Sequence, residues 1–318
     1  MAKIVLLDKP RENPGELDWS DLLALGECTI YDETPPELAA GRIGDAEIVL
    51  LNKTPLPADT LRRCPNLKLI SVIATGFNTV DTAYAAERGI LVSNVPSYGS
   101  EAISQHAVAL LLELTNHVAH HDAEVRKGRR NSASDWCFWD YSILELESKT
   151  AGIVGLGHIG KITAQILLAF GMNVLAYDTC HDPAWETARS RYTDLDTLFH
   201  TSDVILLHCP LLEENRHMIR SDTIGKMKDG VILINNSRGG LVAEEDLASA
   251  LNSGKIAAAG LDTVETEPIS MDSPLLNAKN CIITPHISWA ALECRQRLQA
   301  TAIDNIRQYL AGTPVNLV

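Results

Sequence analysis

Short runs of leucine and β-branched residues alternate with amphipathic helical patterns from one end of the chain to the other. This alternation is typical of parallel sheets that are covered by helices on both faces. One series of expected strands fills the first third of the chain, and a second series begins near Thr150 and is too long to share one open sheet with the first. The expected strands are residues 3–8, 28–31, 47–51, 69–74 and 90–93, and then 151–155, 173–178, 204–208, 231–235, 257–262 and 281–284.

The boundary between the two series is predicted at the turn of residues 94–99, where Pro and Gly interrupt the pattern. A long amphipathic helix over residues 100–128 should follow this turn. After the last strand, residues 285–288 form a second crossover, and a closing helix over residues 291–310 is long enough to pack back on the first domain. The predicted domains are a substrate domain of residues 1–99 with 287–318 and a dinucleotide domain of residues 100–286.

Composition excludes several classes of function. The chain has 318 residues, 46% of them hydrophobic, and a formal net charge of -14. Without a stripe of Lys and Arg it is not expected to bind nucleic acid, and no window reaches the ~20 apolar residues of a membrane span. The seven scattered cysteines form no C-x-x-C pair and no cluster at metal-ligand spacing, which indicates reduced thiols in a cytoplasmic protein without a metal site.

The strongest local motif is Gly155-Leu156-Gly157-His158-Ile159-Gly160, directly after the apolar run 151–154 and at the start of a helical pattern that extends to about Phe170. Glycines at this spacing give a tight turn, let a backbone approach a pyrophosphate, and allow the helix to pack closely on the strand. A glycine-rich turn without a ligand has the same sequence, so the motif alone does not decide.

Asp178 strengthens the dinucleotide interpretation. It ends the next strand, about 20 residues beyond the motif, where a carboxylate can accept hydrogen bonds from the adenosine ribose. The same carboxylate repels a 2′-phosphate, and Thr179, Cys180 and His181 add no basic group, so NAD is favoured over NADP. The alternative is an aspartate that only forms a turn.

Three later strands are each followed by one residue suited to 2-oxo acid chemistry. Arg238 stands before a Gly pair, acids including Glu267 follow the strand at 257–262, and His286 follows the last strand. Reduction of a 2-oxo acid needs a cation to bind the carboxylate and a proton donor that titrates near neutral pH. Taken singly, each residue is compatible with a structural role, which is the commoner one for a lone His or an acid before Pro. Together, after a dinucleotide motif, they indicate an active site.

The whole chain resembles the D-isomer-specific 2-hydroxyacid dehydrogenases. The resemblance is carried, in order, by residues 155–160, Asp178, His208-Cys209-Pro210-Leu211, residues 236–240, residues 262–268 and Pro285-His286. It implies that Arg238 binds and polarises the substrate, that Glu267 hydrogen-bonds the catalytic imidazole, and that His286 is the general acid/base. It also implies two doubly wound parallel-sheet domains, a Rossmann NAD-binding domain and a flavodoxin-like substrate domain, with a cleft between them.

The same resemblance implies further contacts. Backbone N–H groups of Thr75, Gly76 and Phe77 would hold the substrate carboxylate, although a simple turn has the same sequence. In this family the long helix after Gly99 and its following loop build a homodimer, which suits the aromatic residues of segment 136–141, although these could equally be core. The implied cofactor contacts are Gly155, Gly157, His158, Ile159, Gly160, Asp178, Cys209, Pro210, Ser237, Arg238 and Asp262.

Segments 74–78 and 286–290 are similar to the glycerate dehydrogenase (hydroxypyruvate reductase) branch, which also accepts glyoxylate. The expected reaction is therefore reduction of hydroxypyruvate to D-glycerate, or of glyoxylate to glycolate, by NADH. Thr266 stands where relatives commonly have Pro, and Ser288 where Gly or Ala is common. The alternatives are a family member of the lactate or phosphoglycerate type and, from another class, an NAD-sensing interaction protein of the corepressor type.

Overall fold

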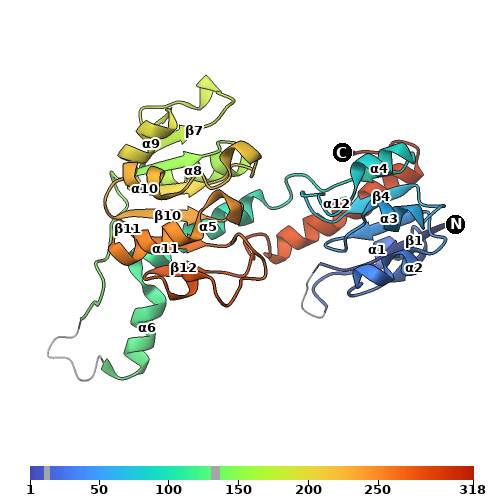
Figure 1. Cartoon of the computed structure of the whole chain (residues 1–318), viewed down its shortest axis with the longest axis horizontal. Helices are drawn as coiled ribbons and strands as arrows, with labels where there is room; N and C mark the ends of the chain where they lie inside the picture. Colours follow the sequence, from blue (N-terminus) through green and yellow to red (C-terminus); the bar gives the residue numbers. More distant parts are fainter. Residues whose placement is uncertain (11–14, 130–136) are drawn as a thin grey trace. The chain divides into compact units, whose positions relative to one another are not determined.

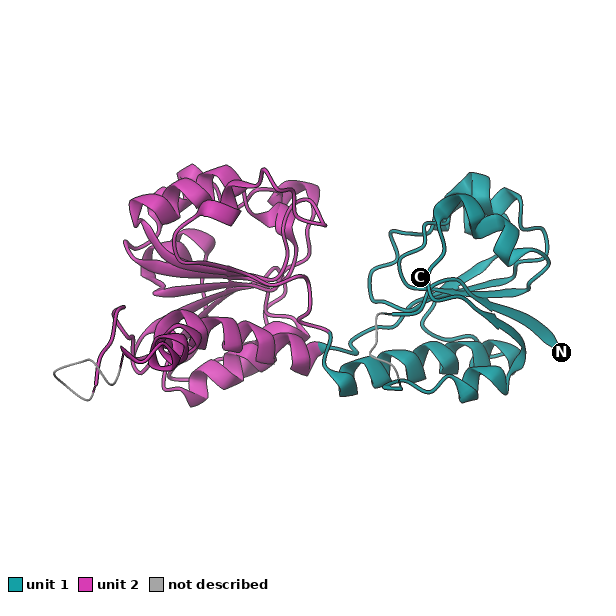
Figure 2. Cartoon of the chain, turned by 90° about the horizontal axis from the view of Figure 1, so that it is seen from below, with its two compact units in different colours: residues 1–99, 290–318 teal, residues 100–289 magenta. Residues whose placement is uncertain are grey.

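The structure, a computed structural model, describes residues 1–10, 15–129 and 137–318 and divides into two compact units (Figures 1 and 2). Unit 1 is Met1–Gly99 with Ala290–Val318, and unit 2 is Ser100–Trp289. The first boundary lies where the sequence predicts it, but the second lies after Trp289 rather than after residue 286. Residues 287–289 stay with unit 2 because Asp262 accepts hydrogen bonds from the N–H groups of Ile287 and Ser288.

Unit 1 contains a five-stranded sheet in the order β2-β1-β3-β4-β5, with every pair parallel. This is the flavodoxin-like order. Strands β3 and β4 are buried along their whole length because helices cover both faces of the sheet (Figure 2). The elements are β1 Ala2–Leu6, α1 Ser20–Leu23, β2 Gly26–Ile30, α2 Ala39–Ile43, β3 Ile48–Leu51, α3 Ala58–Arg62, β4 Leu69–Val72, α4 Thr82–Glu87, β5 Leu91–Ser93 and α12 Leu292–Leu310.

The closing helix α12 packs on the sheet of unit 1, as its length predicts. Ser71 in β4 donates a hydrogen bond from Oγ to the carbonyl of Ala302, at 3.3 Å. Arg295, only 7% exposed, pairs with Glu16 at 2.7 Å. A buried guanidinium is tolerated because it has this partner.

Unit 2 contains a seven-stranded parallel sheet in the order β12-β11-β10-β9-β6-β7-β8. From β8 to β11 this is the Rossmann order, extended by β12, so the expectation of two parallel-sheet α/β domains is confirmed. Strand β8 lies at the edge and was not expected, because its three residues form no apolar run. The elements are α5 Ser100–Asn116, α6 Val118–Arg126, β6 Thr150–Val154, α8 His158–Ala169, β7 Asn173–Tyr177, β8 Ser190–Tyr192, α9 Leu195–Thr201, β9 Val204–Leu207, α10 Ser221–Lys226, β10 Val231–Asn235, α11 Glu244–Ser253, β11 Ile256–Leu261 and β12 Cys281–Ile283, with 3-10 turns at Pro183–Trp185, Glu213–Asn215, Gly239–Leu241 and Pro274–Asn277.

The single helix predicted over residues 100–128 is wrong, because the structure has two helices that meet at His117. This residue adopts a left-handed conformation, with φ 51°. The Asn116 side chain bonds back to the carbonyl of Leu112, and the Glu113 carboxylate accepts the N–H of Ala119 at 3.3 Å. These side chains compete with the backbone ladder and cap the start of α6, so the helix ends and restarts.

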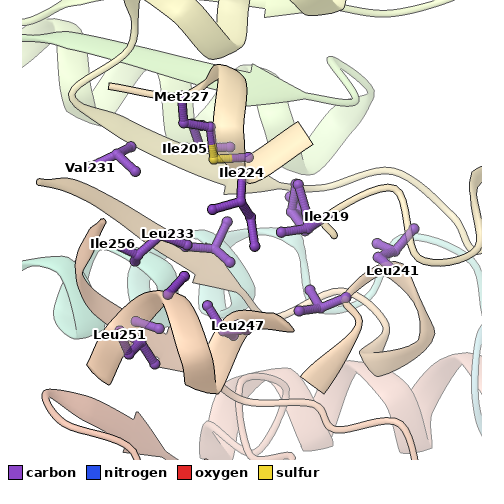
Figure 3. Close-up of a cluster of buried hydrophobic side chains, with 14 of the residues drawn as sticks. Ile205, Ile219, Ile224, Met227, Val231, Leu233, Leu241, Leu247, Leu251 and Ile256 are labelled. Carbon is purple, nitrogen blue, oxygen red and sulfur yellow. The ribbon is translucent and has the colours of Figure 1, made fainter. Parts of the chain in front are cut away.

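One face of the unit 2 sheet packs against α10 and α11 through a cluster of buried aliphatic side chains (Figure 3). Leu233, Leu241 and Leu247 are each 0% exposed. This core fixes the strands whose carboxyl ends carry the predicted site. None of the described helices is both long and apolar enough to cross a bilayer.

Candidate active site

The glycine turn between β6 and α8 is shaped by close backbone contacts. Gly155 has φ +96°, and a Cβ on it would stand 2.5 Å from the backbone nitrogen of Cys209. A Cβ on Gly160 would stand 2.2 Å from the carbonyl oxygen of Gly155. Real Cβ atoms do not approach so closely, so both positions require glycine for the turn to form.

Gly157 differs from these two, because a Cβ on it would meet nothing within 4 Å. It is the N-cap of α8, and its position supplies no capping side chain. Gly157 therefore supplies no side chain to cap the first N–H groups of α8 and leaves open space at the positive end of the helix, an arrangement suited to a pyrophosphate. The turn fits a dinucleotide.

Asp178 stands beside this turn, immediately after β7. One carboxylate oxygen accepts the N–H of Leu156 at 2.6 Å and the other accepts the N–H of Cys180 at 2.9 Å. Each oxygen keeps a second lone pair, so the carboxylate is held in place and can still accept ribose hydroxyls. Asp178 and the turn that it contacts therefore fit NAD together.

The neighbouring segment after β9 begins with His208 and Cys209, which are both uncharged. Burial raises the pKa of Cys209 to about 11 and lowers the pKa of His208 to about 4, so both side chains are neutral near pH 7. Ser237 Oγ donates to the carbonyl of Cys209 at 2.6 Å, and the carbonyl of Pro210 accepts from Asn215 at 2.8 Å. Cys209, Pro210 and Ser237 thus lie in one hydrogen-bonded group at the carboxyl edge of the sheet.

Arg238, Glu267 and His286 follow β10, β11 and β12, which are neighbours in the sheet. Carboxyl ends of parallel strands meet at one edge, so the three loops start side by side. The first two loops also touch, because a Cβ on Gly239 would stand 1.9 Å from the backbone carbon of Val264. Arg238 itself is exposed, and its guanidinium donates to the carbonyl of Ser237 at 2.8 Å.

His286 and Glu267 form a hydrogen-bonded pair, with 2.7 Å between His286 Nδ1 and Glu267 Oε2. Burial would raise the pKa of Glu267, but the hydrogen bond and charge of His286 outweigh it and hold this pKa below its ordinary value. Since Nδ1 is engaged, Nε2 is the ring nitrogen left for a substrate. The pair can therefore present a proton on Nε2 and support the charged ring.

Asp262 has a different position from the other predicted residues. It is 1% exposed, and its carboxylate accepts hydrogen bonds from Thr284 Oγ1 and from the N–H groups of Ile287 and Ser288, at 2.5, 2.9 and 2.8 Å. The loop of His286 is thus wrapped around one buried carboxylate. This anchoring contact was not expected from the sequence.

A second group of contacts that the sequence does not indicate holds the acid loop. Glu265 accepts hydrogen bonds from Arg216 and His217, and its N–H donates to Glu244 at 2.8 Å. The loop residues flank a hollow of about 240 Å³ whose charged lining residues are all acidic: Glu244, Glu245, Glu265 and Asp272. The partners lie 21 to 49 positions apart in sequence, so no spacing reveals them.

The predicted carboxylate-binding segment Thr75-Gly76-Phe77 lies in unit 1, shortly after β4, and is described with that unit alone. Thr75 Oγ1 donates to the carbonyl of Val95 at 2.8 Å, and Asn94 donates to the carbonyl of Thr75 at the same distance. Phe77 is 38% exposed. The turn is therefore fixed by hydrogen bonds within its own sheet edge.

Comparisons with known proteins agree with this geometry. The family model for the NAD binding domain of D-isomer specific 2-hydroxyacid dehydrogenases matches residues 108–288. The chain is 54% identical over 319 residues to a hydroxypyruvate reductase of Blautia hydrogenotrophica, covering 99% of each, and 40% identical over 291 residues to a glycerate dehydrogenase of Methylorubrum extorquens, covering 91% of this chain and 90% of that one. A solved D-lactate dehydrogenase from Aquifex aeolicus, complexed with NAD and lactic acid, matches with TM-score 0.83 and 31% identity over 98% of this chain and 96% of that one.

Proposed function

The chain belongs to the D-isomer-specific 2-hydroxyacid dehydrogenases and is an NAD-dependent oxidoreductase of 2-oxo and 2-hydroxy acids. From this premise we propose that it reduces hydroxypyruvate to D-glycerate. The observation that carries the proposal is the 2.7 Å contact between His286 Nδ1 and Glu267 Oε2 at the carboxyl edge of a Rossmann sheet. Relatives that are named glyoxylate reductase, at 36% and 35% identity, support glyoxylate as a second substrate, reduced to glycolate.

In the proposed mechanism His286 is the general acid/base. Bound NADH supplies the hydride to C2 of the 2-oxo acid. His286 donates the proton from Nε2 to the carbonyl oxygen, because Nδ1 is engaged with Glu267. Glu267 fixes the orientation of the ring and stabilises its charged form.

Arg238 is proposed to bind the substrate carboxylate and to polarise the carbonyl, since a guanidinium offers several donors and only one is engaged in its contact with Ser237. The N–H groups of Thr75, Gly76 and Phe77 are proposed to hold the same carboxylate. For the cofactor we assign the pyrophosphate to the turn, the ribose to Asp178, the adenosine to the β9 loop and the nicotinamide to the ends of β10 and β11. The assigned residues are Gly155, Gly157, His158, Ile159, Gly160, Asp178, Cys209, Pro210, Ser237, Arg238 and Asp262.

The proposal is tested by the loss of NADH absorbance with a panel of hydroxypyruvate, glyoxylate, pyruvate and phosphohydroxypyruvate, each also with NADPH. We expect the highest kcat/KM with hydroxypyruvate and NADH. Phosphohydroxypyruvate should be poor, because the relatives named hydroxypyruvate reductase and glycerate dehydrogenase, at 54% and 40% identity, share more of this sequence than two relatives named D-3-phosphoglycerate dehydrogenase, each at 36%. Faster turnover of pyruvate or of the phosphorylated acid would overturn the substrate assignment. NADH binding without turnover of any acid would indicate a sensor of the corepressor type.

We also propose a homodimer and a cytoplasmic location. Residues of α6 and of the segment 137–143 leave apolar side chains exposed, among them Val118 at 63%, Trp139 at 65% and Ile143 at 55%. Exposed apolar side chains that gather on neighbouring elements mark interaction surfaces. Trp136, which the sequence assigns to the same segment, lies outside the described residues. Light scattering coupled to gel filtration measures the mass, and a monomer would contradict the proposal.

A further inference from the structure

Helix α5 contributes none of the residues assigned above, yet its N-terminal part contacts three separate parts of the site. The carbonyl of Ile103 accepts a hydrogen bond from Asn236, next to the Arg238 loop, at 2.9 Å. Ser104 Oγ donates to the carbonyl of Ile159, in the first turn of α8 after the glycine turn, at 3.1 Å. His106 Nε2 lies 3.1 Å from Thr284 Oγ1, in the loop of His286.

The contact of His106 continues to the buried carboxylate that anchors this loop. Thr284 Oγ1 hydrogen-bonds to Asp262 Oδ1, which also accepts the N–H of Ile287 and lies 3.6 Å from His106 Nε2. A hydroxyl has one proton, so Thr284 gives it to the carboxylate and accepts a second hydrogen bond from the His106 ring. Hydrogen bonds from α5 and from the backbone on the far side of His286 thus meet at the Asp262 carboxylate.

His286 needs this support because of its own backbone. It has φ 56°, the left-handed region that costs a residue with a side chain free energy unless its surroundings hold it there. The opposite side of the loop is held by Asn236, 7% exposed, whose Nδ2 lies 3.3 Å from Ser288 Oγ. Relatives with Gly or Ala in place of Ser288 would lack this hydroxyl.

Helix α5 is rigid enough to serve as such a support. It packs directly on β11 and β10, where a Cβ on Gly260 would stand 3.0 Å from Leu110 Cβ. Leu111 and Ala107, on the same helix, are 0% exposed. A packed helix has little freedom to shift, so its polar contacts fix the loops that they reach.

We propose that the N-terminal part of α5 is a positioning frame for the active site, in which His106 is a positioning residue for His286 and Ser104 one for the glycine turn. The kinetic part rests on the proposed function, since it takes His286 as the proton donor. The structural part does not, because it concerns the order of the 284–288 loop in the chain without substrate.

The test compares His106→Phe, which removes the ring nitrogen but keeps a planar side chain, with His106→Gln, which restores a donor near the Nε2 position. Hydrogen exchange measured by mass spectrometry in the cofactor-free protein should show faster exchange of the amides at Ile287 and Ser288 in H106F, by about tenfold, and near-parental exchange in H106Q. Kcat should fall about tenfold in H106F with NADH affinity retained, and recover in H106Q.

Ser104→Ala should show the complementary pattern, a weaker NADH affinity by about threefold with unchanged exchange at residues 287–288. The matched control is His200→Phe, because His200 is an exposed helical histidine that bonds only to Asp196 of its own helix among the described contacts. H106F with parental exchange and kcat would overturn the proposal. So would an H106F that loses NADH affinity, thermal stability and kcat together, without rescue by H106Q. If the parental protein turned over none of the 2-oxo acids, the proposed function would be rejected, but the hydrogen-exchange result would still test the structural part of the proposal.

Discussion

The glycine turn and the His286 loop lie at the carboxyl edge of the same sheet, but different features fix their conformations. In the turn, side chains are absent, so that Gly155 and Gly160 can bring backbone atoms together. In the loop, side chains far along the chain supply the hold. His286 bonds to Glu267, 19 positions away, and the carboxylate of Asp262 binds N–H groups 25 and 26 positions away.

This difference predicts different consequences of mutation. Because the turn requires glycines without a Cβ, a substitution that adds a Cβ should lower either the stability of the fold or the affinity for the cofactor. Because the loop requires hydrogen bonds from other side chains, a substitution that removes one of these side chains should lower kcat. The two regions should therefore separate cleanly in experiments that measure NADH binding, unfolding and kcat on the same variants.

The largest expected effect is on turnover, from His286→Asn. Asn tolerates the left-handed backbone of position 286, so the loop should keep its path while the proposed proton donor is lost. We expect kcat for hydroxypyruvate to fall by about 10²–10⁴-fold, the usual contribution of a general acid. NADH affinity, measured by fluorescence titration, should stay within about twofold, because the cofactor turn is untouched.

His200→Asn is the matched control for this variant and should keep the parental kcat, since His200 is exposed and its hydrogen bond, among the described residues, stays within its own helix. Equal losses of kcat and NADH affinity in H286N would mean that residue 286 shapes the cofactor site rather than donating the proton. The separation of the two regions would then fail.

The next effect in size comes from two alanines within the glycine motif. Gly160→Ala places a Cβ 2.2 Å from a backbone oxygen, so the folded state should lose about 1–3 kcal/mol and Tm should fall by several degrees. Gly157→Ala meets no protein atom within 4 Å and has φ -70°, so Tm should hold or rise slightly. Its methyl group would fill the space assigned to the pyrophosphate, and the Kd for NADH should rise about tenfold.

Each glycine variant is the control for the other, with Tm from calorimetry and Kd from fluorescence. A G157A protein that binds NADH as tightly as the parent would show that the open space over residue 157 is not the pyrophosphate site. A G160A protein with parental Tm would show that the turn can relax, which the close backbone contact argues against.

The contrast also explains which features could be predicted from the sequence. The parallel sheets and the turn were predictable because apolar strands and G-x-G-x-x-G are local patterns, and residue 160 contacts residue 155 within the same motif. The sequence pattern predicts strand ends one residue too far at Asp178, His208, Asp262 and Thr284. The N–H groups of His208, Asp262 and Thr284 still bond to a neighbouring strand, so the chain leaves the ladder directly after these residues. These side chains therefore stand outside the strands, where they can reach neighbouring loops.

The contacts of His106, Asn236 and Glu265 could not be predicted, since each joins segments that no spacing rule connects. His106 reaches Thr284 across 178 positions, and Asn236 reaches Ile103 across 133. The helix break at His117 could not be predicted from the sequence for a related reason. The apolar pattern continues through it, and the backbone turns there because His117 is left-handed and the side chains of Glu113 and Asn116 hydrogen-bond to the backbone around it.

The smallest expected effect concerns the pH dependence of stability at Glu267. Burial raises its pKa, but the hydrogen bond and charge of His286 and the N–H of Val264 together hold this pKa below the ordinary 4.5. A carboxyl whose folded pKa is lowered stabilises the fold above the unfolded pKa, and the contribution is lost as pH falls through the folded pKa. Glu267→Gln should therefore lower Tm near pH 6–7, and the difference from the parent should shrink as the pH falls below the ordinary carboxyl pKa.

The size of this effect is limited by solvent, because the Glu267 side chain is 39% exposed. Screening should keep the contribution below about 1 kcal/mol, or a shift of a few degrees at most. Glu87→Gln, at an exposed position on α4, is the control and should run parallel to the parent at every pH. If the Tm of E267Q also followed that of the parent from pH 3 to 7, the range in which an ordinary carboxyl group titrates, the pair would make no charge-dependent contribution to stability. The His286 loop would then depend on Asp262 and the α5 contacts alone, and the contrast with the glycine turn would rest on those contacts.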